Sequence, residues 1–82
     1  MYRIVLDEET EAQIEALPYE ALAPLAELLD VLTVAPWNGE SLNDAKPDAP
    51  LRAWAFGRFG LLTYLIFEDQ QRVDLIRVVW VD

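Results

Sequence analysis

The sequence predicts one α+β domain, residues 1–82, in which a helical hairpin packs on one face of a mainly antiparallel sheet. Apolar residues recur at helical spacing in the first half of the chain and alternate as in strands over the last third. The length of 82 residues suits a single domain. The expected order of elements is β-α-α-β-β-β, with a sheet of about four strands.

The N-terminal segment predicts a short strand followed by an acidic helix. Residues 2–6 alternate in side-chain direction, as in a strand with one buried face. Asp7 is a favourable N-cap, and the glutamates that follow it suit the positive end of a helix. We expect this helix to cover residues 8–17, where Pro18 ends it.

A second helix is expected to run to about Val34, with a broad apolar stripe on one side and acidic residues on the other. Pro24 is tolerated only in a first turn, so we expect the regular helix to begin near Ala23. The stretch 36–50 is rich in Pro, Asn, Asp and Gly and is interpreted as a loop. A loop of this length is either functional or a crossover from helix to sheet.

The last third predicts three strands joined by tight turns. Residues 51–56 form the first of them and 57–60 turn the chain. Residues 61–67 are apolar on both faces, as in a central strand. Residues 68–71 form a hairpin turn, and the final strand covers 72–81.

The composition excludes several classes of site. There is no Cys and no His, which removes disulfides, thiolate or imidazole metal ligands and the commonest general base. The acidic run that begins at Asp7 has no metal-ligand spacing, and we expect neither a metal nor a cofactor. A net charge of −9 repels nucleic acid. No apolar run is long enough to cross a membrane, and we expect a cytoplasmic protein.

Several short segments, taken in order, resemble the RelE/ParE superfamily of bacterial type II toxin–antitoxin toxins. They are an opening strand, a Leu-Pro break between the helices, a Leu, Pro and Gly after the second helix, and a set of core strands. The segments are residues 2–6, 16–18, 32–39, 51–57, 62–66 and 72–78. The resemblance covers nearly the whole chain and implies the RelE-like fold.

The resemblance also implies a function. Toxins of the RelE branch cleave messenger RNA in the ribosome, ParE relatives inhibit DNA gyrase, and both are held by an antitoxin whose tail wraps the toxin. By resemblance, the candidate catalytic residues are Arg52, Arg77 and Tyr64. Leu61 stands where the family usually has an Arg, and the family's C-terminal His- or Tyr-bearing tail has no match.

Two interpretations remain open. In the first, the protein acts by protein–protein binding and its ribonuclease site is degraded, with little or no catalysis. In the second, it is an active ribosome-dependent mRNA endoribonuclease. The expected partner is an antitoxin-like protein or a second copy of the chain.

Three aromatic residues are the candidate partner-binding residues. On the register we expect, Trp54, Phe56 and possibly Trp80 share the sheet face that the helices leave bare, beside Arg52. The alternative is that these aromatics belong to the core and that the loop around Trp37 covers them. The register of the strand decides between the two interpretations, because a shift by one residue moves every side chain to the opposite face of the sheet. We also expect Arg72 to pair with Asp74.

Overall fold

The computed structural model describes residues 1–81. It contains seven regular elements, in the order β1 (Arg3–Val5), α1 (Glu8–Glu15), α2 (Tyr19–Leu32), β2 (Glu40–Ser41), β3 (Leu51–Phe56), β4 (Gly60–Phe67) and β5 (Arg72–Trp80). Two short 3₁₀ helices, η1 (Pro36–Asn38) and η2 (Glu68–Gln70), complete the description.

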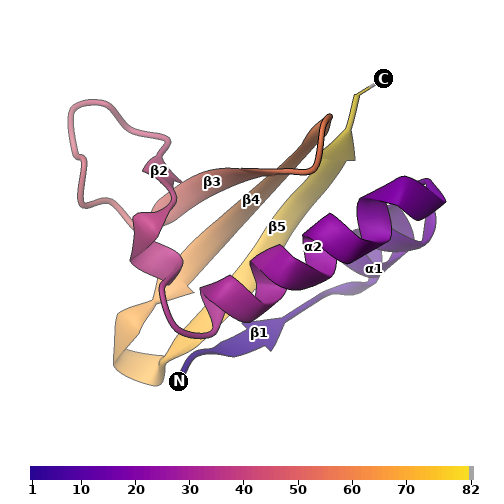
Figure 1. Ribbon diagram of the computed structural model, residues 1–82. Coiled ribbons are helices and arrows are strands. Elements are labelled where there is room, and N and C mark those ends of the chain that lie inside the picture. Colours follow the sequence, from indigo (N-terminus) through magenta and orange to yellow (C-terminus); the bar gives the residue numbers. More distant parts are fainter. Residues whose placement is uncertain (82) are drawn as a thin grey trace.

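The strands form one five-stranded sheet in the order β1-β5-β4-β3-β2. β1 runs parallel to β5, and the other neighbours are antiparallel (Figure 1). The predicted α+β class, with two helices packed on a mainly antiparallel sheet, is confirmed. The sheet has one strand more than expected. This strand, β2, lies within residues 36–50, which we interpreted as a loop.

The helices begin where local chemistry favours it. The Asp7 carboxylate accepts a hydrogen bond from the Thr10 N–H at 2.8 Å, which caps α1 as expected. α2 begins directly after Pro18, so the prediction that the regular helix starts near Ala23 is wrong. Pro24 therefore lies inside the helix, where it lacks one backbone donor.

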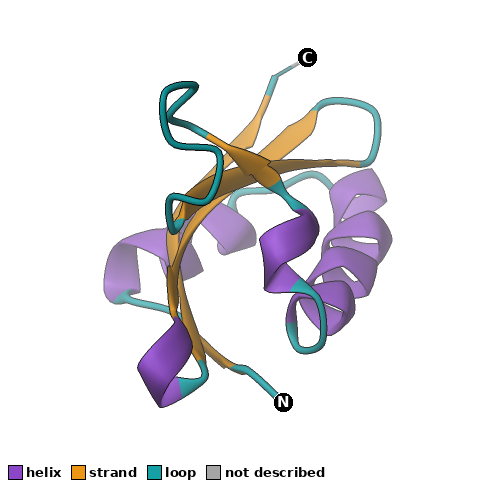
Figure 2. Cartoon of the chain, turned by 90° about the vertical axis from the view of Figure 1, so that its left-hand side faces the viewer, coloured by secondary structure: helices purple, strands orange, loops and turns teal. Residues whose placement is uncertain are grey.

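The core lies between α2 and the inward-facing residues of the central strands. Figure 2 shows the sheet nearly edge-on and curved, with α2 on its concave side. The helix contributes small and aliphatic residues at helical spacing, and the sheet contributes alternate residues of β4 and β5. The core residues are Ala21, Leu25, Leu28, Leu32, Phe56, Leu62, Tyr64, Ile66, Val73, Leu75 and Val78.

α1 packs along β5 beyond the short stretch where β1 pairs with it. Ile14 and Leu17 pack against the same core as α2. The side chain of Gln13 accepts a hydrogen bond from the Val78 N–H at 2.7 Å. The helix therefore satisfies an edge amide of β5 that would otherwise be open to another strand.

The register of β3 is opposite to the one we expected. Arg52 pairs across the ladder with Tyr64, and Phe56 pairs with Gly60, so these residues share the helix-facing side. Phe56 lies in the core, and Trp54 is half-buried against it. The bare face instead carries Leu51, Ala53 and Ala55 from this strand. The expected alternation of side chains along β3 is confirmed, but the side chains that we expected on the bare face point toward the helices.

Candidate functional site

Arg52 is buried, with 7% of its surface exposed, and four backbone carbonyls surround its guanidinium. Nη1 donates to the carbonyls of Trp37 and Gly39 at 3.1 and 2.9 Å, and Nη2 donates to that of Pro47 at 2.7 Å. Nε donates to the Ala49 carbonyl at 3.0 Å. A buried charge needs such partners, and here they come from the segment between α2 and β3. Arg52 therefore fixes that segment against the sheet.

Tyr64 lies beside Arg52 and is fully buried. Its hydroxyl donates to the Pro36 carbonyl at 2.7 Å. Burial raises the pKa of Tyr64 to about 12, and the neighbouring Arg52 charge only partly opposes this rise. The phenol therefore stays protonated at neutral pH and holds η1 against the sheet.

Arg77 lies apart from the other two candidate catalytic residues. It is opposite Thr63 on the bare face of the sheet, and it is exposed. Arg52 and Tyr64 point to the helix side, so the sheet separates them from Arg77. The structure brings two of the three predicted residues together and not the third.

The three predicted partner-binding aromatics also lie on the helix side. Phe56 is buried, and its ring centroid is 5.9 Å from that of Trp80. Phe59 meets Trp80 edge-on at 5.7 Å. Trp54 and Trp80 are half-buried and pack against the core. These aromatics do not form a bare aromatic surface, and the expectation that they face away from the helices is wrong.

A second polar cluster joins segments that are far apart in the sequence. Glu68 accepts hydrogen bonds from the Tyr2 hydroxyl at 2.5 Å and the Trp37 indole N–H at 2.6 Å. The side chain of Gln71 donates to the same carboxylate at 2.7 Å. These bonds, that from Tyr2 foremost, hold the pKa of Glu68 below its usual value. No local pattern signalled this cluster, because its members come from the residue before β1, from η1 and from the β4–β5 turn.

The bare face of the sheet carries exposed apolar residues together with basic ones. Leu51 and Leu61 are 39% and 44% exposed, and Ile76, the extra residue where the β4–β5 register shifts, is 45% exposed. Arg3 and Arg72 are opposite each other on β1 and β5. Arg72 pairs with Asp74 at 2.8 Å, as predicted. No basic residue occurs between Arg3 and Lys46, so both helices are purely acidic.

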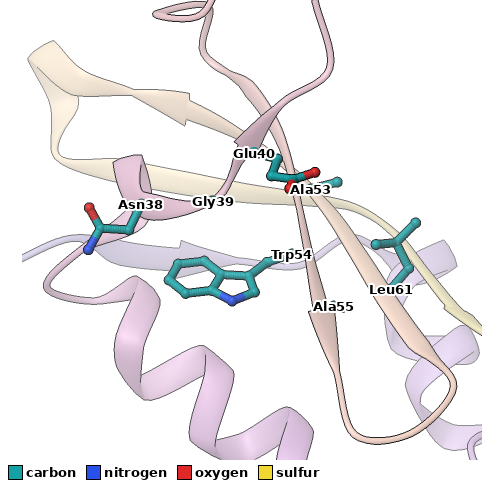
Figure 3. A pocket seen from close by; sticks show the side chains of 7 residues that line it. All are labelled: Asn38, Gly39, Glu40, Ala53, Trp54, Ala55 and Leu61. Atoms are coloured by element: carbon teal, nitrogen blue, oxygen red, sulfur yellow. The ribbon is translucent and has the colours of Figure 1, made fainter.

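A groove of about 400 Å³ lies where this bare face meets the edge of β3. Figure 3 shows the Trp54 ring on one side of the strand, and Glu40 and Leu61 on the other. The lining residues are Asn38, Gly39, Glu40, Ala53, Trp54, Ala55 and Leu61. The backbone of β3 between Trp54 and Ala55 thus forms part of the groove.

Within residues 1–81, no cluster of three or more potential ligands is arranged to hold a metal ion. Neither helix in that range has the length and apolar character that crossing a membrane requires.

Comparison with known proteins shows the fold and no more. The chain matches no model of a known protein family and no curated protein. Among solved structures, it is similar to the conserved hypothetical protein HP0892 from Helicobacter pylori, with a TM-score of 0.60 and 14% sequence identity. The likeness covers 98% of this chain and 94% of that one. The arrangement of helices and strands is therefore shared over nearly the whole length.

Proposed function

We propose that this protein is a RelE/ParE-like, protein-binding component of a bacterial toxin–antitoxin type system, and that it does not cleave RNA. The observation that supports the proposal best is the use of Arg52 as a structural residue. Its guanidinium is buried and donates four of its five N–H groups to carbonyls of its own chain.

The other candidate catalytic groups do not compensate. Cleavage of a phosphodiester needs positive charge where negative charge develops, together with a group that moves a proton. Tyr64 is buried with a pKa of about 12 and is separated from solvent. Arg77 is on the opposite face, and the chain has no His. The groups that the chemistry requires therefore do not converge.

Protein binding is favoured by the surface that remains. The sheet face opposite α2 exposes Leu51, Leu61 and Ile76. Exposed apolar residues beside charged ones are typical of a protein interface. The charge of −9 on every copy opposes self-association, so a basic partner protein is favoured over a second copy.

The partner-binding part is tested with two matched variants. Leu61 on the bare face and Leu22 on α2 are both 44% exposed. The tagged wild type, Leu61→Asp and Leu22→Asp are purified from the native host, and the bound proteins are identified. We expect a stoichiometric partner with the wild type and Leu22→Asp that is lost with Leu61→Asp. A partner retained equally by both variants would contradict the use of this face.

The absence of catalysis is tested in a translation extract. We expect no codon-dependent cleavage of messenger RNA when purified protein is added. Arg77→Ala is the appropriate control, because Arg77 is exposed and the substitution leaves the fold intact. Cleavage by the wild type that disappears with Arg77→Ala would show that the protein is an active endoribonuclease.

A further inference from the structure

One stretch of the sheet edge has no pairing strand. β2 pairs with β3 only at Arg52 and Ala53. The chain that precedes β2 turns away into η1, so Trp54–Phe56 has no neighbouring strand on that side within residues 1–81. This open stretch borders the groove seen in Figure 3.

The N–H and C=O groups of Ala55 point away from β4, toward the open stretch of the sheet edge. The Leu51 carbonyl accepts from the Leu42 N–H on the β2 side, whereas the preceding carbonyl, of Pro50, accepts from β4. Backbone groups alternate in direction along a strand, so Ala53 faces β2 and Ala55 faces the open edge. Neither group of Ala55 forms a turn, loop or cap hydrogen bond within the described residues.

The open stretch contrasts with the other long strand edge. On β5, one of the amides beyond the reach of β1, that of Val78, is satisfied by the side chain of Gln13. Proteins commonly block such edges, because an open edge is a template for another chain. Among residues 1–81 no side chain bonds to the Ala55 backbone in this way, and addition of an extended peptide to a sheet edge is a recurring mode of recognition.

We propose that the edge of β3 at Ala55 binds an extended segment of a partner protein as an added strand, antiparallel to β3 and in line with β2. The proposal rests on the protein-binding function above and specifies its site and chemistry. The partner residue opposite Ala55 is Lys or Arg, and its two neighbours are apolar.

The choice of side chains follows from the register. A residue opposite Ala55 points to the same side as Glu40 and Leu61. Glu40 is exposed and forms no ion pair within the described residues, and no basic side chain lines the groove. Its carboxylate therefore attracts a cation at that position. The neighbouring partner residues point to the opposite side, where the half-buried Trp54 ring offers an apolar contact.

The direct test uses a synthetic hexapeptide of alternating Lys and Val with blocked ends, added to the full-length ¹⁵N-labelled protein. We expect chemical-shift changes at the Ala55 amide and the Trp54 indole, and slower hydrogen exchange at Ala55 by about fivefold or more at millimolar peptide. The same peptide with every Lys amide N-methylated cannot form the ladder and should not bind. Equal binding of both peptides, or shifts confined to residues such as Leu65 and Val79, would overturn the proposal.

Two variants of the protein sharpen the test. Ala55→Pro removes the N–H that faces the open stretch but none that bonds to β4, and proline is tolerated on edge strands. We expect it to keep the thermal midpoint and lose the peptide. Glu40→Lys should lose the Lys-Val peptide and bind a Glu-Val peptide instead. It provides the decisive result if Ala55→Pro fails to fold, and an unchanged preference would overturn the proposal.

The two proposals can fail separately. If the native partner is lost with Leu61→Asp but retained with both Ala55→Pro and Glu40→Lys, the protein binds through its bare face and strand addition is wrong. If the wild type retains no stoichiometric partner at all, the protein-binding function itself is contradicted.

Discussion

The two faces of the sheet use similar side chains for different purposes. On the concave face, Arg52 and Tyr64 are buried, and their polar atoms bond to backbone carbonyls of the segment between α2 and β3. On the other face, Arg77 and Leu61 are exposed. An arginine or tyrosine at a position that suggests catalysis can thus have a purely structural role. The surface that remains free is the one without the candidate catalytic pair.

Charge separates the two sides as well. The helices carry only acidic charged residues, whereas Arg3, Arg72 and Arg77 lie on the bare face. The acidic helices repel a negatively charged polymer, whereas the bare face carries Glu40 and Asp74 beside its arginines, so a basic protein segment finds acidic partners there too.

The largest effect is expected for Arg52→Ala. It leaves four carbonyls of the loop without their donor, and it removes the group that holds the loop on the sheet. We expect a loss of about 3 kcal/mol or more in the free energy of unfolding, measured by urea denaturation. The matched control is Arg77→Ala, which should change this free energy by less than about 0.5 kcal/mol. Equal effects of the two variants would refute a structural role for Arg52.

A smaller loss is expected for Gly39→Ala. A Cβ at Gly39 would lie 2.0 Å from the Tyr64 hydroxyl oxygen, which a buried ring cannot avoid. We expect destabilisation of about 2 kcal/mol, as for other overpacked cores. In a Tyr64→Phe background the cost should fall, because the clashing oxygen is gone. Additive effects of the two substitutions would show that this contact does not limit the packing.

The Tyr64 phenol should make the fold sensitive to alkaline pH. Its pKa is raised to about 12 in the folded protein and is about 10 in an unfolded chain, so the native state holds the proton more tightly. The stabilisation is complete below pH 10 and is lost as the pH rises toward 12, by about 2 kcal/mol. Tyr64→Phe should lack this component. An ultraviolet titration in which no tyrosine ionises late would contradict the assignment.

The sequence predicted the elements better than their orientation. The strands over residues 51–56 and 61–67 and the Asp7 cap were visible because alternation and capping are local. β2 has only two residues and is too short to show an alternating pattern. α2 begins before Pro24 because Pro18 already starts the helix, and packing on the sheet compensates for one missing donor.

The sequence does not show which face of β3 points toward the helices, because both of its faces are apolar enough to be buried. Leu51, Ala53 and Ala55 form one face, and Arg52, Trp54 and Phe56 form the other. An arginine usually indicates the solvent side. Here the carbonyls that satisfy it come from residues 37–49, whose conformation the sequence does not specify. The Glu68 cluster escaped prediction for the same reason, since its members meet only in the folded chain.

Leu61→Asp should have the smallest effect on stability and the largest effect on partner binding. Leu61 and Leu62 are adjacent on β4, but Leu61 is 44% exposed on the bare face and Leu62 is fully buried against the helix. Leu62→Ala should cost about 3 kcal/mol through lost contacts and a cavity. Leu61→Asp should change the free energy of unfolding by less than about 0.5 kcal/mol, because it adds a charge where water already reaches. Urea denaturation of both variants measures this difference. If Leu61→Asp unfolds the protein, the bare face belongs to the core of the fold, and loss of a partner by that variant carries no information about binding.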